Sequence, residues 1–122
     1  MASILVVDDE PVVRALLRAA LAPAGSRVVE AVDGSEALEV AWREQPDVVL
    51  LDVGLPKLSG LDVCRALKTN PAAPRVLLIT GNANLERIDD CGADGVVTKP
   101  FHPAELLELV RHHLAEAATA AA

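Results

Sequence analysis

The chain has almost no aromatic side chains and very few cysteines, and both shortages narrow what it can be. Trp42 and Phe101 are the whole aromatic complement, because there is no tyrosine. Since 52% of the 122 residues are hydrophobic, the core of a single domain must consist of Leu, Val, Ile and Ala. Cys64 and Cys91 are too few for a disulfide framework, so we expect two buried free thiols.

Basic residues are scarce as well. Eleven Lys and Arg stand against 18 Asp and Glu, which gives a net charge of −7. Neutralising nucleic-acid phosphates requires clustered cations, so we expect no direct nucleic-acid binding by this chain. Apolar runs are only a few residues long, which excludes a transmembrane helix. Met1-Ala2-Ser3 leads straight into an apolar segment without a signal-peptide pattern. We therefore expect a cytoplasmic protein without membrane contact.

Apolar runs of strand length alternate with stretches of helical period, which predicts an α/β fold with (βα)5 organisation. The expected architecture is a doubly wound, five-stranded parallel sheet in the flavodoxin-like order 2-1-3-4-5. Segment 27–32 mixes in charge and suits an edge strand. The predicted strands are 3–8, 27–32, 47–52, 75–80 and 95–98, and the predicted helices are 11–22, 34–45, 59–69, 83–91 and 103–118.

One domain over 1–118 accounts for all these elements. The alanine-rich residues 119–122 are expected to be a frayed helix tail or the stub of a linker.

Polar residues stand where the apolar runs end. Asp8 and Asp9 follow the first strand, Asp52 ends the third, Thr80 ends the fourth, and Lys99 follows the fifth. Because the carboxyl ends of parallel strands meet at one edge, we expect these side chains to converge. Three neighbouring carboxylates repel one another, and a hard divalent cation with oxygen ligands relieves that repulsion. The pattern predicts a Mg²⁺ site.

The same edge suits phosphoryl transfer. A bound Mg²⁺ and the Lys99 ammonium would offset the repulsion between a carboxylate and an anionic phosphoryl donor. One aspartate can then act as nucleophile and become an acyl phosphate. Asp52 is the candidate because it ends a central strand. The small residues Gly54, Pro56 and Gly60 after it are expected to leave room for the donor.

Seven short segments carry a recognisable pattern: Val6-Val7-Asp8-Asp9-Glu10, Asp33-Gly34-Ser35-Glu36-Ala37-Leu38, Pro46-Asp47-Val48-Val49-Leu50-Leu51-Asp52, Leu55-Pro56-Lys57-Leu58-Ser59-Gly60-Leu61, Thr80-Gly81, Gly92-Ala93-Asp94-Gly95 and Lys99-Pro100-Phe101. In this order and spacing, they resemble the receiver domain of two-component response regulators, the CheY-like domains, from residue 4 to about 116. A single Asp-Asp or Lys-Pro is a weak signal, whereas the full set in register is specific.

The resemblance implies a phosphoacceptor with a metal site. Asp52 would accept a phosphoryl group from a sensor histidine kinase, a phosphotransfer protein or a small donor such as acetyl phosphate. Asp9 would bind Mg²⁺ directly, Asp8 largely through water, and the Gly54 carbonyl would complete the protein ligands together with Asp52.

The resemblance also implies how the signal is read. Thr80 would hydrogen-bond the phosphoryl group and report its arrival, and Lys99 would pair with Asp52 before phosphorylation and with the phosphoryl oxygens afterwards. The Lys99–Pro100 peptide would be cis, which proline makes accessible. The chain would catalyse only its own phosphorylation and slow dephosphorylation, so we do not expect an enzyme acting on an external metabolite. It would control an unknown output partner or a C-terminal output domain.

Two features depart from the family pattern. Val96 stands where receivers usually carry an aromatic residue, so the usual Thr-plus-aromatic switch cannot operate in full. The interval from Thr80 to Lys99 is also shorter than usual by about one helical turn, which predicts an abbreviated helix over 83–91 with Leu85, Ile88 and Cys91 as its apolar contacts. We therefore expect a reshaped output surface, with phosphorylation mainly reordering the loops after Thr80.

Two alternatives remain open. The chain could be a receiver-like scaffold with an altered or lost phospho-switch. It could also be an aspartyl-nucleophile phosphatase, which forms an acyl phosphate too. Such phosphatases need a second acid two residues after the nucleophile, and that position here is Gly54.

Overall fold

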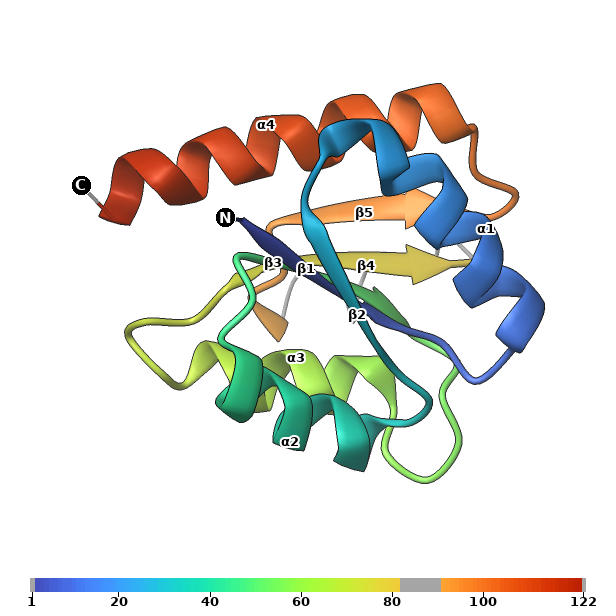
Figure 1. The fold of residues 1–122 in the computed structure, drawn as a ribbon. Helices are drawn as coiled ribbons and strands as arrows, with labels where there is room; N and C mark the ends of the chain where they lie inside the picture. Colours follow the sequence, from blue (N-terminus) through green and yellow to red (C-terminus); the bar gives the residue numbers. More distant parts are fainter. Residues whose placement is uncertain (1, 82–90, 122) are drawn as a thin grey trace.

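The computed structural model describes residues 2–81 and 91–121, with side chains up to residue 118. Its centre is one parallel sheet in the order β2-β1-β3-β4-β5, which confirms the predicted topology (Figure 1). Strand β2 lies at an edge, where its charged residues are tolerated. The strands are β1 (Ser3–Val7), β2 (Arg27–Ala31), β3 (Val48–Asp52), β4 (Arg75–Thr80) and β5 (Gly95–Thr98).

Helices cover both faces of the sheet. Figure 1 shows α1 and α4 on one side and α2 and α3 on the other. Each of the ten predicted elements except the helix over 83–91 has its counterpart; that segment lies outside the described residues apart from Cys91. The described helices are α1 (Pro11–Leu21), the short 3₁₀ helix η1 (Ala22–Ala24), α2 (Gly34–Glu44), α3 (Gly60–Lys68) and α4 (Pro103–Ala121).

The sheet is buried on both faces because its central strands are continuous apolar runs. Side chains alternate along each strand, so successive residues enter different cores. One core lies under α1 and α4 and contains Ile4, Val6, Leu17, Leu21, Val48, Leu50, Leu77, Ile79, Leu106 and Val110. The other lies under α2 and α3 and includes Leu5, Val7, Ala37, Val49, Leu51, Val63, Leu67, Val76 and Leu78. The two cores hold the strand ends in register.

Local signals in the sequence set the helix starts. The Asp33 carboxylate accepts a hydrogen bond of 2.8 Å from the Glu36 amide, and Ser59 Oγ accepts one of 3.3 Å from the Asp62 amide. Glu36 reaches back and accepts from the amide of Val32 at 3.1 Å, which completes a reciprocal cap of α2. These caps lie at the starts of α2 and α3.

The two thiols are buried and form no disulfide, as predicted. Burial raises the pKa of Cys64 to about 12, and Cys64 Sγ lies 3.3 Å from the carbonyl oxygen of Cys91. Because the reactive form of cysteine is the thiolate, this side chain is a packing residue at neutral pH.

Two large apolar side chains of the helices are exposed: Leu16 is 55% and Trp42 is 54% exposed. His112 and His113 lie within α4, which continues to Ala121. Residues 119–121, predicted to be a frayed helix tail or the stub of a linker, also belong to α4. The domain assignment itself stays a prediction.

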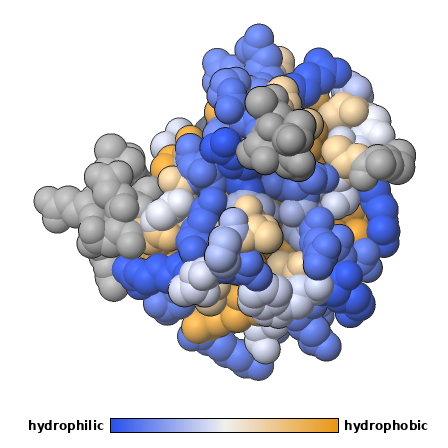
Figure 2. Space-filling view, turned by 90° about the vertical axis from the view of Figure 1, so that its left-hand side faces the viewer, coloured by the Kyte–Doolittle hydropathy of each residue, from blue (hydrophilic) through white to orange (hydrophobic). Residues whose placement is uncertain are grey.

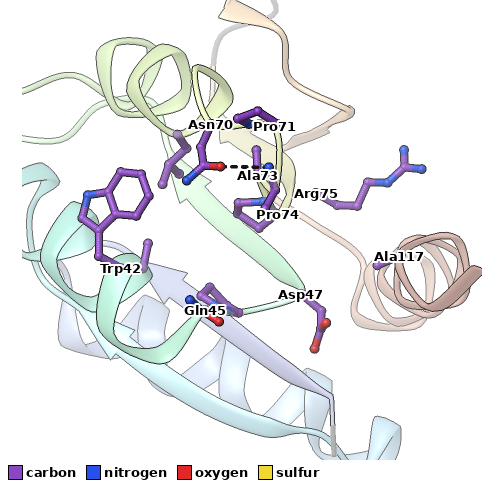
Figure 3. Close-up of a pocket in the computed structure, with 13 residues that line it drawn as sticks. Trp42, Gln45, Asp47, Asn70, Pro71, Ala73, Pro74, Arg75 and Ala117 are labelled. Atoms are coloured by element: carbon purple, nitrogen blue, oxygen red, sulfur yellow. Dashed lines mark hydrogen bonds between the residues drawn. The ribbon is translucent and has the colours of Figure 1, made fainter. Parts of the chain in front are cut away.

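Trp42 borders a pocket of about 470 Å³ at the end of the sheet where the strands begin (Figure 3). Asp47 and Arg75 also line it, and the loop from Asn70 to Pro74 forms one wall. Figure 2 views this end of the molecule and shows hydrophobic residues interspersed among hydrophilic ones. The pocket lies at the opposite end of the strands from the polar residues singled out in the sequence.

The described helices include none that is both long enough and apolar enough to span a bilayer.

Candidate functional site

The polar residues at the strand ends lie together at the carboxyl edge of the sheet. Strand pairing explains why: Val7 pairs with Leu51, Asp52 with Ile79, and Thr80 with Thr98. The residues that follow these positions are therefore brought to the same edge although they lie far apart in the sequence.

Three carboxylates form the centre of the site. Asp8, Asp9 and Asp52 each offer an oxygen, and these oxygens all lie within 4.8 Å of one another. Asp8 is fully buried and Asp52 is 7% exposed, whereas Asp9 is exposed. Carboxylate oxygens at this spacing are the hard ligands that Mg²⁺ prefers, and the exposed side leaves room for water and an anionic ligand. The donor set therefore fits a divalent cation.

Asp8 and Asp9, the two acids after β1, differ in their hydrogen-bond and ion-pair partners. Asp8 Oδ1 accepts a hydrogen bond of 2.9 Å from the Glu10 amide, and Asp8 Oδ2 lies 3.4 Å from Lys99 Nζ. No described group pairs with the carboxylate of Asp9. Asp9 is thus the acid that is free to coordinate a cation directly, while both oxygens of Asp8 already have partners.

One carboxylate oxygen of Asp52 contacts two groups. The Gly54 amide donates to Asp52 Oδ1 over 3.2 Å, and Lys99 Nζ lies 3.5 Å from the same oxygen. Burial raises the pKa of Asp52 above its usual value; the Gly54 hydrogen bond opposes this shift, and the negative charge of Asp8 adds to it. The charged carboxylate is therefore in an unfavourable environment despite its lysine partner.

Lys99 forms ion pairs with two of the acids, Asp8 and Asp52. Its burial alone would lower its pKa, but the charges of Asp52 and Asp8 outweigh that effect and raise it. The ammonium is therefore fully charged at neutral pH, and it lies between the two buried carboxylates. The Lys99–Pro100 peptide is cis, as the resemblance implied.

Thr80 and two glycines lie around Asp52. Thr80 is buried at the end of β4, and its carbonyl accepts a hydrogen bond of 2.8 Å from the Lys99 amide. A Cβ on Gly54 or Gly81 would meet little, which agrees with an open approach on these sides. Val96, at the position where an aromatic residue is expected, is partly buried against the core under α2 and α3.

Gly60 has a different role from the one expected. A Cβ at this position would lie 2.7 Å from Val53 Cα and would clash with the carbonyl oxygen of Asp52. Gly60 also donates its amide to the Val53 carbonyl at 3.1 Å. This glycine therefore does not make room for a donor; it lets the start of α3 pack directly on the backbone of Asp52.

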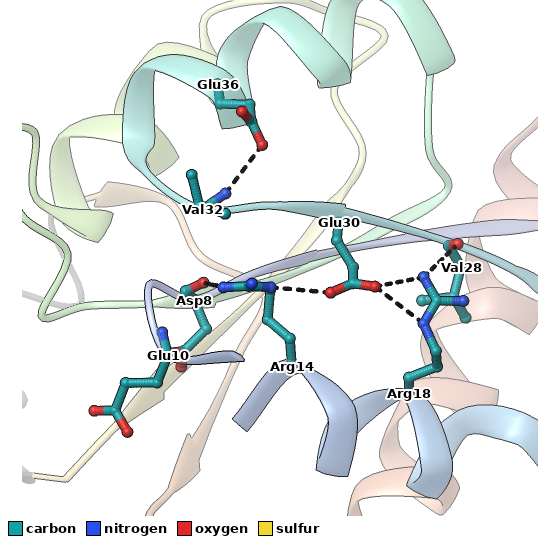
Figure 4. A network of polar contacts seen from close by, with 8 residues as sticks. All are labelled: Asp8, Glu10, Arg14, Arg18, Val28, Glu30, Val32 and Glu36. Atoms are coloured by element: carbon teal, nitrogen blue, oxygen red, sulfur yellow. Dashed lines mark hydrogen bonds and ion pairs between the residues drawn. The ribbon is translucent and has the colours of Figure 1, made fainter. Parts of the chain in front are cut away.

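Sequence reasoning missed one contact with the site. Arg14 Nη1 donates a hydrogen bond of 2.7 Å to the backbone carbonyl of Asp8 (Figure 4). The same guanidinium pairs with Glu30 of the edge strand. The available signal was an arginine one helical turn beyond the acidic pair, but its partner on β2 could not be identified without the sheet register.

An apolar groove of about 570 Å³ lies beside the site. Lys99 forms its end nearest the carboxylates, and the exposed Leu16 lies along it. The groove runs between α1 and the loop that enters α4, and the other lining residues are Val13, Ala19, Ala20, Pro100, Phe101 and Pro103.

Comparison with known sequences finds relatives among transcriptional regulatory proteins. The chain is 41% identical over 113 residues to the transcriptional regulatory protein KdpE of Mycobacterium tuberculosis, covering 91% of this chain and 50% of KdpE. It is 44% identical over 108 residues to the alkaline phosphatase synthesis transcriptional regulatory protein PhoP of Bacillus subtilis, covering 84% of this chain and 44% of PhoP. The chain thus spans about half the length of the curated relatives that it matches.

Comparison with solved structures gives the same fold. The chemotaxis response regulator CheY4 of Vibrio cholerae superposes with a TM-score of 0.85 at 31% identity, covering 93% of this chain and 98% of CheY4. A CheY-like receiver domain protein of Methanospirillum hungatei superposes with a TM-score of 0.90 at 27% identity, covering 98% of each chain.

The family model for the response regulator receiver domain matches residues 4–111, which is most of the chain. The fold, the strand order and the relatives agree with that match. The chain belongs to the response regulator receiver domain family.

Proposed function

We propose that this receiver domain is a phosphorylation-controlled switch in which Asp52 accepts a phosphoryl group in a Mg²⁺-dependent reaction. The observation that supports it best is the cluster of Asp8, Asp9 and Asp52 oxygens within 4.8 Å, with the Lys99 ammonium beside Asp8 and Asp52. Three carboxylates beside one lysine leave negative charge that a divalent cation would neutralise.

Asp9 and Asp52 would hold the cation directly, with the Gly54 carbonyl as a further ligand and Asp8 acting through water. Asp8 fits the indirect role because both of its oxygens are engaged with Glu10 and Lys99. When bound, Mg²⁺ supplies charge neutralisation between the acceptor carboxylate and the incoming phosphoryl oxygens.

In the transfer, a carboxylate oxygen of Asp52 attacks phosphorus and forms the P–O bond of an acyl phosphate. The bond from phosphorus to the donor breaks: with acetyl phosphate, acetate leaves; with a phosphohistidine, the imidazole leaves and takes up a proton. Lys99, 3.5 Å from Asp52, would move its pairing to the phosphoryl oxygens. Thr80, buried at the neighbouring strand end, would hydrogen-bond the new group.

A histidine kinase or a phosphotransfer protein would supply the phosphoryl group in the cell. The apolar groove between Leu16 and Phe101 gives such a partner a surface to contact beside Lys99. Residues that follow the receiver in the relatives, or a separate protein, would receive the signal. The related chains are named as transcriptional regulators, so a regulatory output suits this chain better than metabolite turnover.

Intact-mass spectrometry after incubation with acetyl phosphate and Mg²⁺ tests the proposal. We expect one phosphoryl group on the wild-type chain, none on Asp52→Asn, and unchanged labelling of Asp62→Asn, a matched loss of an exposed carboxylate. Omitting Mg²⁺ should abolish labelling. Labelling that persists on another residue of Asp52→Asn would contradict the assignment.

The same experiment distinguishes the alternatives. An unlabelled wild-type chain that folds normally would favour a receiver-like scaffold that has lost the phospho-switch. Release of the alcohol from a phosphate ester with many turnovers would favour a phosphatase. Gly54 offers no side-chain acid for that leaving group, so we expect no such turnover.

Reordering of the loops after Thr80 on phosphorylation stays a prediction, because residues 82–90 lie outside the described residues. Amide spectra of the free and beryllofluoride-bound chain test it. Signals of residues 81–98 that do not change would remove the idea.

A further inference from the structure

Arg14 is attached to the backbone of the acidic turn. It lies in the first turn of α1, where its amide donates to the Glu10 carbonyl at 3.1 Å. Side chains of a helix lean toward its N-terminus, so Arg14 reaches back over Glu10 to the strand end. There Nη1 donates to the Asp8 carbonyl at 2.7 Å. That carbonyl belongs to the peptide that links Asp8 to Asp9, and the Arg14 side chain is only 14% exposed.

Glu30 fixes the other side of the same guanidinium. It lies on edge strand β2, paired in register with Val6 of β1. Its Oε1 accepts from Arg14 Nε at 2.9 Å, while its Oε2 accepts from Arg18 at 2.7 Å, so each oxygen serves one arginine (Figure 4). Arg14 is therefore held between the edge strand and the acidic turn.

The pairing with Glu30 also keeps Arg14 from pairing with the carboxylates of the site. No ion pair within the described residues joins Arg14 to the carboxylates of Asp8, Asp9 or Asp52. An arginine fork binds carboxylates strongly and often through two bonds, so an unrestrained Arg14 close to Asp9 would compete with a cation for it. With its Nε committed to Glu30, Arg14 contacts the main chain of the turn and leaves the carboxylate of Asp9 available.

We propose that Arg14, oriented by Glu30, is a positioning residue for the cation site. It holds the Asp8–Asp9 peptide so that the carboxylate of Asp9 faces the oxygens of Asp8 and Asp52. This inference rests on the proposed function, because it assigns Arg14 to the same Mg²⁺ site. Outer partners that orient metal ligands commonly change metal affinity ten- to a hundredfold when they are removed.

A positioning role for Arg14 and a role as a simple positive charge predict opposite effects of its substitution on Mg²⁺ affinity. If Arg14 were only a positive charge near the site, Arg14→Gln would reduce repulsion and tighten Mg²⁺ binding. If it positions Asp9, the same substitution weakens binding, by about tenfold. Glu30→Gln should also weaken binding, because it releases Arg14 toward the carboxylates.

Arg18→Gln is the matched control. It removes the same charge, from the same helix and the same Glu30 partner, but Arg18 contacts the Val28 carbonyl and not the acidic turn. We expect its dissociation constant for Mg²⁺ to stay within about twofold of the wild-type value, since exposed ion pairs contribute little. Mg²⁺ titrations monitored by amide signals give these constants, and the spectra without metal should show shifts at Asp9 and Glu10 in Arg14→Gln only.

The outcomes separate the two proposals. A wild-type chain that binds no Mg²⁺ would overturn the proposed function and the inference with it. A wild-type chain that binds Mg²⁺ would overturn the inference alone in any of three cases: Arg14→Gln binds equally well or more tightly, Arg18→Gln loses as much affinity as Arg14→Gln, or the signals of Asp9 and Glu10 without metal do not respond to Arg14→Gln.

Discussion

The two ends of the sheet surround a carboxylate in opposite ways. At the end where the strands begin, Asp94 is bound by Lys68 at 2.5 Å, by Arg75 at 3.4 Å and by the Val76 amide at 2.8 Å. Burial alone would raise the pKa of Asp94, but these partners outweigh it and hold the pKa below the usual value. At the other end, burial and Asp8 raise the pKa of Asp52.

The difference lies in the balance of charge around each carboxylate. Two cations and an amide serve one acid at Asp94, whereas one lysine serves two buried acids at the carboxyl edge. A carboxylate whose partners are complete stabilises the fold, and one whose partners are incomplete is available for a ligand. The comparison thus distinguishes a structural acid, Asp94, from the proposed phosphoryl acceptor, Asp52, in the same sheet.

Removing the structural acid should have the largest effect on stability. Asp94→Asn loses charge-assisted hydrogen bonds and leaves Lys68 and Arg75 without their partner. We expect the free energy of unfolding to fall by about 2–3 kcal/mol, measured by urea denaturation at pH 7. Asp62→Asn, which removes an exposed ion pair with Arg65, should cost under about 0.5 kcal/mol. Equal losses for the two variants would contradict the comparison.

Supplying a cation should stabilise the other end. A ligand that binds only the folded state adds about 1.4 kcal/mol when its concentration is ten times its dissociation constant. Mg²⁺ should therefore raise the melting temperature of the wild-type chain, and the rise should disappear in Asp9→Asn. Equal stabilisation of both by Mg²⁺ would show that the effect arises elsewhere.

Removing the functional acid should not destabilise the fold without metal. Asp52→Asn removes a charge that burial and Asp8 disfavour, so we expect the free energy of unfolding at pH 7 to stay unchanged or rise by up to about 1 kcal/mol. Because the folded-state pKa of Asp52 is raised, the cost of its charge is present above that pKa. The cost fades as the pH falls toward the unfolded value of about 3.9.

The advantage of Asp52→Asn over the wild-type chain should accordingly shrink on acidification through that range. Denaturation of both chains at a series of pH values measures it. An advantage that grows on acidification would have the wrong sign for a raised pKa.

A smaller pH dependence of stability comes from His113, and it adds to the one expected for Asp52. His113 is buried on α4, its Nδ1 has no hydrogen-bond partner among the described residues, and burial followed by the charge of His112 lowers its pKa. Asp94 and Glu116 act against this shift, while Arg75 adds to it. Stability is then full above the unfolded pKa of about 6.5 and is lost as the pH falls through the lower folded value.

His113→Gln, in a chain that keeps Asp94, should reduce the loss of unfolding free energy on acidification by roughly 1 kcal/mol or less. Denaturation at pH 7 and pH 5 compares the two chains. If the variant loses as much stability on acidification as the wild-type chain, groups other than His113 cause that loss.

Much of this arrangement could be predicted from the sequence, because periodicity and strand-end residues are local patterns. The strand order and the edge position of β2 followed from them. So did the meeting of Asp8, Asp9 and Asp52 at one edge. Their roles in phosphoryl transfer remain a proposal.

What the sequence could not supply depends on side-chain pairing between distant elements. The three partners of Asp94, the link from Glu30 through Arg14 to the Asp8 carbonyl, and the exposure of Trp42 all depend on which neighbour covers which flank. Gly60 was read as open space because a glycine in a loop does not show whether another backbone approaches it.

The close approach at Gly60 places the start of helix α3 directly against the backbone of Asp52 and Val53. Because no side chain lies between them, we expect a change in the packing beneath α3 to shift the backbone of Asp52. The residues that pack beneath α3 are therefore positions outside the acidic cluster through which the geometry of Asp52 can be altered.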